Sequence, residues 1–345
     1  MSTSTHNGLW GPSDARASGE STESAPVPPS TLAPPLRTLL RTFALQDIMM
    51  LTYLVVVRLL LTRAASSAQQ IGASRVTEVC IGVVLLAVVV GRLLPGVPAI
   101  VRKAVYGTGL VGVLLTNYLV LRDLLPVIRP DSVDAALLEI DIALFGAEPS
   151  LVLEALNVRP VVEWFSFFYF SYFFIGGTYM LFAVWLTRPS KHTTAFAIGT
   201  LMVFCIGQLG YMAVPGYGPH QFLASQFHGP VNGGFFWKCV WDTVQAGSAM
   251  KDIFPSLHTA VPTWFTLYAW NCSKDDPRWK WPARITGFFA ANIIFSTVFL
   301  RWHYAIDVVA GLTLAITAGV VAPRLARLEQ AWRERHGFRG AWIFS

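Results

Sequence analysis

The chain has 345 residues, of which 54% are hydrophobic and 13% are charged, and its mean hydropathy is +0.50. Soluble domains carry roughly twice that share of charged residues, so these values exclude a soluble globular protein and predict a polytopic membrane protein. The net charge of +6 does not indicate a nucleic-acid partner, because the basic residues lie at the ends of apolar segments and not along one stripe. The four cysteines are scattered and show neither a disulfide framework nor the spacing of metal ligands.

The N-terminal segment, residues 1–36, differs in composition from the rest of the chain. It is rich in Ser, Thr, Pro, Gly and Ala and has no hydrophobic periodicity, so we expect a disordered tail. The segment also lacks the short basic and then apolar pattern of a cleaved signal peptide. We therefore expect the first apolar segment to remain in the protein as a membrane segment.

Eight apolar segments follow, each close to the roughly 20 residues that a helix needs to cross a bilayer core. They predict an all-α, polytopic membrane protein with about eight transmembrane helices. The segments are 43–62, 76–95, 104–121, 161–187, 194–214, 255–272, 284–301 and 304–322. The first is the weakest, because Asp47 and Arg58 interrupt it, and it could instead lie at the membrane interface.

The distribution of basic residues predicts the orientation of these segments. Eight crossings place both termini on the same side, and the loops on that side carry more Lys and Arg than the loops on the other. By the positive-inside rule the termini are cytoplasmic, and the protein is expected in a plasma or inner membrane. The loops that precede the segments at 255 and 304 then lie together on the outer face.

Two loops on the outer face contain predicted helices of their own. In residues 131–145 the apolar side chains share one stripe, so we expect an amphipathic helix on the membrane surface with its acids in solvent. A metal site is a weaker interpretation of these acids, since no His or Cys accompanies them. In residues 215–251, four apolar side chains follow helical spacing, at Trp237, Val240, Trp241 and Val244. This interfacial helix could form a lid over a site or simply anchor the loop.

The residues best suited to catalysis lie at the starts of two apolar segments. His303 and Asp307 are four residues apart, so on a helix they share a face, where the carboxylate would fix the ring tautomer and favour the imidazolium. Upstream, Pro255 is typical of a helix start, which places Ser256 and His258 in a first turn whose unpaired N–H groups favour an anion. Either histidine alone could be an ordinary interfacial residue. The two together predict a phosphate site at a membrane face.

These motifs resemble those of the type 2 phosphatidic acid phosphatase superfamily, whose pattern is Pro-Ser-Gly-His, then Ser-Arg, five residues, His, three residues and Asp. The residues that match in type and spacing are Pro255, Ser256, His258, Ser296, His303 and Asp307. The resemblance implies a six-helix catalytic core over 104–322, preceded by two accessory transmembrane helices over 37–103 and followed by a basic cytoplasmic tail over 323–345.

The sequence departs from that pattern at two positions, where Leu257 replaces the glycine and Thr297 replaces the arginine. Arg301 could supply the missing guanidinium. These changes resemble the branch that contains the inositol phosphorylceramide synthases, which transfer a phospho-alcohol head group to a lipid hydroxyl. The family's first motif is matched by Arg122 and Arg129, which either reach the phosphate from another loop or are interfacial arginines; Lys251 is a further candidate.

The resemblance implies a lipid phosphatase or phosphotransferase that acts on a phospholipid or lipid phosphate. His303 would attack phosphorus, Asp307 would hold its tautomer, and His258 would protonate the leaving oxygen and then activate the acceptor. Ser256 and Arg301 would stabilise charge on the phosphoryl oxygens, without a metal or another cofactor. Two other classes stay open: a membrane transporter, although the charges cluster at the ends of segments, and a vanadium haloperoxidase, although that group is soluble.

Overall fold

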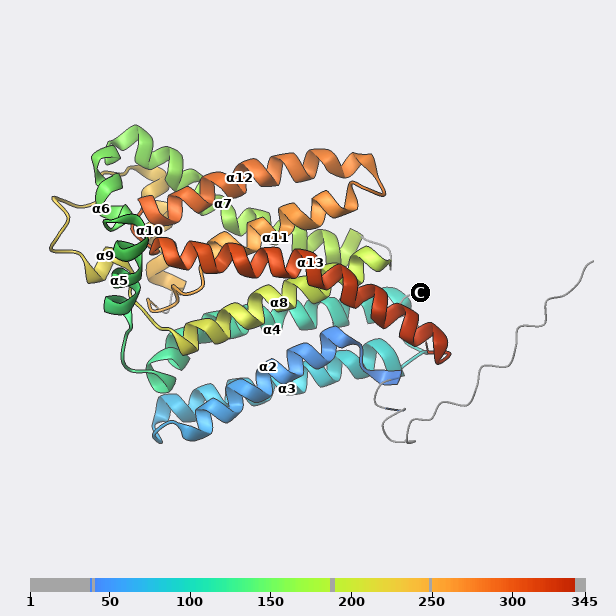
Figure 1. The fold of residues 1–345 in the computed structure, drawn as a ribbon. Coiled ribbons are helices and arrows are strands. Elements are labelled where there is room, and N and C mark those ends of the chain that lie inside the picture. Colours follow the sequence, from blue (N-terminus) through green and yellow to red (C-terminus); the bar gives the residue numbers. More distant parts are fainter. Residues whose placement is uncertain (1–37, 39–40, 187–189, 248–249, 339–345) are drawn as a thin grey trace, which may run out of the picture. The chain divides into compact units, whose positions relative to one another are not determined.

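Long apolar helices that lie side by side make up the fold (Figure 1). The structure, a computed structural model, describes residues 38, 41–186, 190–247 and 250–338, which belong to one unit, Leu32–Ser345. Within these residues the secondary structure is helical throughout and contains no strand. The prediction of an all-α, polytopic membrane protein is therefore confirmed. The predicted tail, residues 1–36, lies outside the described residues.

Seven helices of the described residues are long and apolar enough to cross a membrane. They are α2 (Leu45–Arg63), α3 (Ala68–Val88), α4 (Ala99–Ile128), α7 (Arg159–Leu181), α8 (Lys191–Ala213), α12 (Lys280–Phe299) and α13 (Ala305–Arg335). The remaining predicted segment, 255–272, coincides with α11 (Leu257–Cys272), whose 16 residues fall short of the roughly 20 that span a bilayer core. Helix α11 packs against α7, α8, α12 and α13, so it lies in the interior of the bundle.

Four short helices gather at one end of the bundle (Figure 1). They are α5 (Asp134–Phe145), α6 (Pro149–Leu153), α9 (Pro219–Phe222) and α10 (Phe235–Gly247). The first two belong to the connection between α4 and α7, and the last two to the connection between α8 and α11. Helix α10 confirms the helix predicted from the spacing of its apolar residues, and its buried Val240 packs into a cluster with Trp302.

The charges that weakened the first predicted span have partners on neighbouring helices. Asp47 is fully buried, lies 3.0 Å from the guanidinium of Arg92 and accepts a hydrogen bond from the Tyr106 hydroxyl. Arg58 pairs with Glu78 of α3 at 2.8 Å on the protein surface. Because α2 packs along α3 and α8, the structure favours a span over an interfacial helix.

The last helix is longer than expected. The sequence predicts a span that ends at residue 322 and then a tail, but α13 continues through Pro323 to Arg335. The extension is held by the start of α2, where Glu329 accepts from the Leu45 backbone N–H at 3.0 Å and Arg333 donates to the Phe43 carbonyl at 2.6 Å. The basic tail predicted from residue 323 is thus helical as far as Arg335, and residues 339–345 lie outside the described residues.

A close approach between two helices sets the position of the functional motifs. A Cβ atom on Gly311 would lie 2.5 Å from the Ser256 carbonyl oxygen, so only glycine lets α13 pack this tightly against the start of α11. At the same place the Ser256 backbone N–H donates to the Asp307 carbonyl at 3.0 Å. The two motifs, some fifty residues apart in sequence, are therefore joined through their backbones.

The buried ion pair of α2 should contribute far more to stability than the exposed one. Asp47→Ala would leave the Arg92 guanidinium buried without its carboxylate, which costs about 3–5 kcal/mol in comparable cases. Arg58→Ala removes an exposed pair worth about 0–1 kcal/mol. We expect thermal unfolding in detergent to show a markedly lower Tm for Asp47→Ala and a nearly unchanged Tm for Arg58→Ala. Equal shifts would contradict the structural role of the buried pair.

Candidate active site

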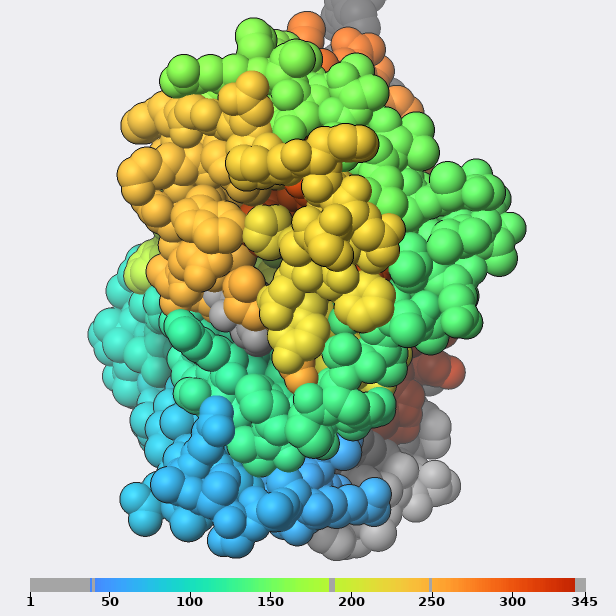
Figure 2. Space-filling model, turned by 90° about the vertical axis from the view of Figure 1, so that its left-hand side faces the viewer, coloured from blue at the N-terminus to red at the C-terminus, as the bar shows by residue number. Residues whose placement is uncertain are grey.

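A cavity of about 510 Å³ lies at the end of the bundle where the short helices gather. Figure 2 shows this face, where the chain between α8 and α11, in yellow and gold, surrounds a hollow. The lining comes from α4, α7, α8, α9, α10 and α11 and from the loops before α9, α11 and α13, and it includes both His258 and His303. The structure therefore brings the two predicted histidines into one cavity.

His303 lies in a tight loop before α13. The Thr297 carbonyl accepts the backbone N–H groups of both Trp302 and His303, at 3.0 and 3.1 Å, and Arg301 adopts a left-handed φ of 70°. The histidine thus precedes the helix, and the shared helical face expected for His303 and Asp307 is not what brings them together. Asp307 is instead in the first turn of α13, where one carboxylate oxygen accepts from the Tyr304 N–H at 3.0 Å and lies 3.3 Å from His303 Nδ1.

The His303 imidazole is neutral at neutral pH. Burial lowers its pKa to about 4, and the nearby Asp252 carboxylate and a hydrogen bond to the Ile253 backbone oppose this only in part. The expectation that a carboxylate partner would favour the imidazolium is therefore wrong, because desolvation outweighs it. With Nδ1 facing Asp307, the lone pair of Nε2 is the nucleophilic position of a neutral ring.

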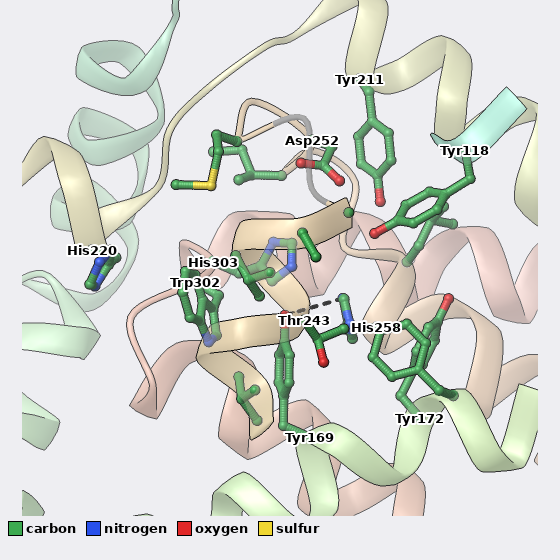
Figure 3. Close-up of a pocket in the computed structure, with 18 of the residues that line it drawn as sticks. Tyr118, Tyr169, Tyr172, Tyr211, His220, Thr243, Asp252, His258, Trp302 and His303 are labelled. Atoms are coloured by element: carbon green, nitrogen blue, oxygen red, sulfur yellow. Dashed lines mark hydrogen bonds between the residues drawn. The ribbon is translucent and has the colours of Figure 1, made fainter. Parts of the chain in front are cut away.

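His258 lies in the first turn of α11, between two tyrosine rings (Figure 3). Its ring centroid is 4.3 Å from that of Tyr169 and 4.3 Å from that of Tyr172, and its Nδ1 lies 3.5 Å from the Tyr169 hydroxyl. Its Nε2 is buried and has no hydrogen-bond partner among the described residues. The ring centroids of His258 and His303 are 6.1 Å apart, and both rings line the cavity.

Ser256 does not line the cavity in this structure. Its buried hydroxyl oxygen accepts from the Thr259 backbone N–H at 3.3 Å, so it is the N-cap of α11. The cap fixes the first turn that carries His258.

The predicted basic residues do not line this cavity either, and its described lining contains no Lys or Arg. The Arg301 guanidinium lies 3.0 Å from Glu154, donates to the Gly229 carbonyl at 2.8 Å and covers the Phe227 ring at 3.7 Å. It lines a neighbouring cavity of about 530 Å³. The physical reason is the left-handed turn at Arg301, which directs its side chain away from that of His303.

The other three basic candidates also lie outside the described lining of the cavity. Lys251 donates to the Pro130 and Asp131 carbonyls at 2.6 and 3.2 Å. Arg129 pairs with the Asp131 carboxylate at 2.7 Å. Arg122 is exposed near the end of α4. The structure therefore gives Lys251 and Arg129 contacts with the protein itself.

The lining of the cavity is instead aromatic and acidic. Five tyrosines contribute to it, namely Tyr118, Tyr169, Tyr172, Tyr211 and Tyr217, together with Trp302, Asp242 and Asp252. Figure 3 shows Asp252 close to Tyr211 and His303. Sequence reasoning missed these residues, and the available signal was weak: Tyr169 and Tyr172 follow helical spacing in an aromatic segment, and Asp252 precedes a motif by a few positions.

Two acids of α5 hold, through hydrogen bonds, backbone segments that border the site. Asp134 accepts from the backbone N–H groups of Tyr217 and Gly218, both at 2.8 Å, and from the Tyr304 hydroxyl. Asp141 accepts from Ala305 and Ile306 at the start of α13, at 2.6 and 2.8 Å. Both side chains are fully buried, so the expectation of a solvated acidic face on this helix is wrong for them.

A third acid lies next to this pair. Burial, and to a lesser extent the nearby Asp141 carboxylate, raises the pKa of Glu148 to about 7. One Glu148 oxygen accepts from the Ser150 N–H at 3.1 Å, so the residue also begins α6. Among the described residues, no group of three or more His, Cys, Asp or Glu side chains is arranged to hold a metal ion.

Comparison with known proteins identifies a family. The sequence profile of the PAP2 superfamily matches residues 135–321, whereas no curated protein and no solved structure matches the chain. The matched region begins in α5, ends in α13 and includes His258, His303 and Asp307. Since it covers more than half of the 345 residues, the chain belongs to the PAP2 superfamily and is an integral membrane protein of that superfamily.

Proposed function

We propose that the protein transfers a phosphoryl group of a membrane lipid through a phosphohistidine formed on His303. The observation that carries this proposal is the pair of imidazoles, 6.1 Å apart in one cavity, of which one is neutral and in contact with a carboxylate. Membership of the PAP2 superfamily supports a phosphatase or phosphotransferase acting on lipids.

The proposed reaction has two steps. His303 Nε2 attacks phosphorus, the bond from phosphorus to the leaving oxygen breaks, and His258 gives that oxygen a proton. The acceptor hydroxyl then loses its proton to His258 as its oxygen attacks phosphorus, and the phosphorus–nitrogen bond to His303 breaks. Asp307 holds the His303 ring with Nδ1 protonated throughout. The phosphate anion between the rings stabilises the protonated form of His258.

Charge on the phosphoryl oxygens needs donors, and the cavity offers hydroxyl and backbone N–H groups. The first turn of α11 carries His258, and the positive end of the helix dipole lies there. Tyrosine hydroxyls of the lining are further donors. In this proposal Arg301 and Lys251 position loops, Arg122 and Arg129 remain outside the cavity, and Ser256 caps the helix.

The charge of the lining favours head-group transfer over hydrolysis of a phosphomonoester. A monoester carries a charge of about −1.5 to −2 at neutral pH, whereas a phosphodiester carries about −1. Asp252 lies near His303, and the described lining offers no Lys or Arg to offset a dianion. A phospholipid diester as donor and a lipid hydroxyl as acceptor, as in inositol phosphorylceramide synthases, is therefore the form of the reaction that we propose.

The roles of the two histidines can be separated by single substitutions. His303→Ala should abolish both turnover and phosphoenzyme formation, since it removes the only nucleophile in the scheme. His258→Ala should slow the reaction by about 10²- to 10⁴-fold, the usual contribution of general acid–base catalysis. The measurement is turnover of phosphatidylinositol labelled with radioactive phosphate, with acid-quenched protein assayed for bound label. Label retained on His303→Ala would refute the nucleophile assignment.

The pH dependence should report the buried His303. Because its pKa is lowered to about 4, the neutral, nucleophilic form persists well below pH 6.5, and the acid limb of the kcat/KM profile should lie near pH 4. Asp252→Asn removes a charge that raises this pKa, so its acid limb should move to still lower pH. An acid limb near pH 6.5 in the wild-type protein would show that the nucleophile is not a desolvated histidine.

The preference for a diester should depend on Asp252. Asp252→Asn should raise the activity on phosphatidic acid relative to phosphatidylinositol by roughly tenfold, because it removes the repulsion between the carboxylate and a dianionic phosphate. A tenfold change corresponds to about 1.4 kcal/mol, which is a modest part of the repulsion between nearby charges in a protein. Asp242→Asn is the matched control, since Asp242 lines the same cavity but is exposed to solvent, which screens its charge, and it lies 2.7 Å from Lys238. If the ratio of the two activities changed equally in both variants, the charge of Asp252 would not be the cause of the preference for a diester.

A further inference from the structure

A second cavity, of about 390 Å³, lies between α4 and α7. Its side walls come from these two helices, and its floor comes from Phe204 of α8 and from Leu257 and Val261 of α11. No described residue that lines it carries a charge. The cavity is therefore an apolar groove in the part of the protein that crosses the membrane.

The groove is continuous with the cavity that holds the histidines. Tyr118, Tyr172, Phe173 and Leu257 line both. Figure 3 shows Tyr118 and Tyr172 on the same side of the catalytic cavity, with Tyr172 next to His258. A molecule with its phosphate between the imidazoles can therefore extend into the groove without leaving the protein surface.

The groove runs along the helices toward the opposite end of the bundle. It follows one face of α7 and of the π-helix η3 (Phe182–Leu186) that continues it, from Tyr172 through Gly176 and Met180 to Val184, which are spaced four residues apart. This corresponds to a length of roughly 18 Å at 1.5 Å per residue. Half of a bilayer core is about 15 Å, so the groove is as long as one leaflet is deep.

The groove is not filled by protein side chains, and residues along it are exposed at the surface that faces the lipid. A Cβ atom on Gly176 or Gly177 would meet no atom within 4 Å, so the space beside these glycines is not filled by the protein. Several large side chains along it are exposed, among them Leu115 and Leu181, each at 59%. Near its far end α4 meets η3 closely, since a Cβ atom on Gly107 would lie 2.7 Å from the Val184 side chain.

We propose that this groove binds a hydrocarbon chain of the lipid substrate while its phosphate lies between His258 and His303. This inference rests on the proposed function and adds to it a binding site for the chain. An apolar lining without charges, a length that matches one leaflet and continuity with the catalytic cavity all fit an acyl chain. The groove then makes the enzyme selective for substrates with long chains.

Filling the groove beside Gly176 tests this selectivity. Gly176→Leu should lower kcat/KM for dipalmitoyl phosphatidylinositol relative to the dibutyryl form by roughly tenfold or more, because each methylene kept out of an apolar site costs about fourfold in affinity. The matched control is Gly112→Leu on α4. Gly112 also has open space around it, but it borders a different cavity, toward α3. We expect an unchanged ratio for this control.

A change of the ratio in Gly176→Leu alone supports the proposal. The same ratio in Gly176→Leu and wild type, or an equal change in the Gly112→Leu control, overturns it. A long-chain lipid that occupies the groove but is not the substrate would leave the ratio unchanged, so it counts among the results that overturn the proposal.

A second measurement does not depend on turnover. Phosphatidylinositol with a photoactivatable diazirine near the end of one acyl chain is added to the His303→Ala protein and irradiated, and the labelled peptides are mapped. Label on α4 and α7, reduced by Gly176→Leu, supports the chain site. Label confined to other helices overturns it. If the wild-type protein turns over neither form of the lipid, the proposed function fails, and the labelling pattern still decides the chain site.

Discussion

The active site depends on two buried carboxylates of α5 that bind backbone N–H groups of other segments. Asp134 holds the loop at Tyr217 and Gly218, and Asp141 holds the first residues of α13. Each N–H left unpaired in a buried place would cost about 1–3 kcal/mol, so these contacts strongly restrict where the segments can lie. Gly218 in turn packs against the carbonyl of Trp302, next to His303. The position of His303 thus follows from a helix that contributes no side chain to the described cavity lining.

Burial has two opposite effects on the chemistry of this site. It removes the charge from His303, which makes the ring a better nucleophile at neutral pH, and it also makes an unpaired anion expensive. In a desolvated cavity, hydroxyl and backbone N–H donors act more strongly than they do in water, and in the proposed reaction they take the place of a guanidinium in stabilising the charge on phosphorus. The tyrosines of the lining and the start of α11 supply such donors.

The sequence alone was sufficient for the helical class, for the approximate positions of the long helices and for the two histidines of the cavity. These depend on long apolar segments and on a strict motif spacing, both of which are local. The placement of Arg301 was not accessible, because its direction is decided by a left-handed turn and by Glu154, which is far away in sequence. The acids of α5 were misjudged for a similar reason. Their alternation with apolar residues is typical of a surface helix, and only the tertiary structure shows that Asp134 and Asp141 face the backbone of distant loops.

Helix α13 is held at both of its ends. Asp141 fixes its first turn beside the site, and Arg333 ties its last turns to the start of α2. Between them, Pro323 cannot donate the hydrogen bond that a continuous helix requires, so the helix can bend there. A helix that is fixed at both ends bends where its backbone hydrogen bonding is weakest. When the bilayer becomes thinner or thicker, the strain on α13 is therefore taken up near the proline, and the axial register between Asp307 and His303 is preserved.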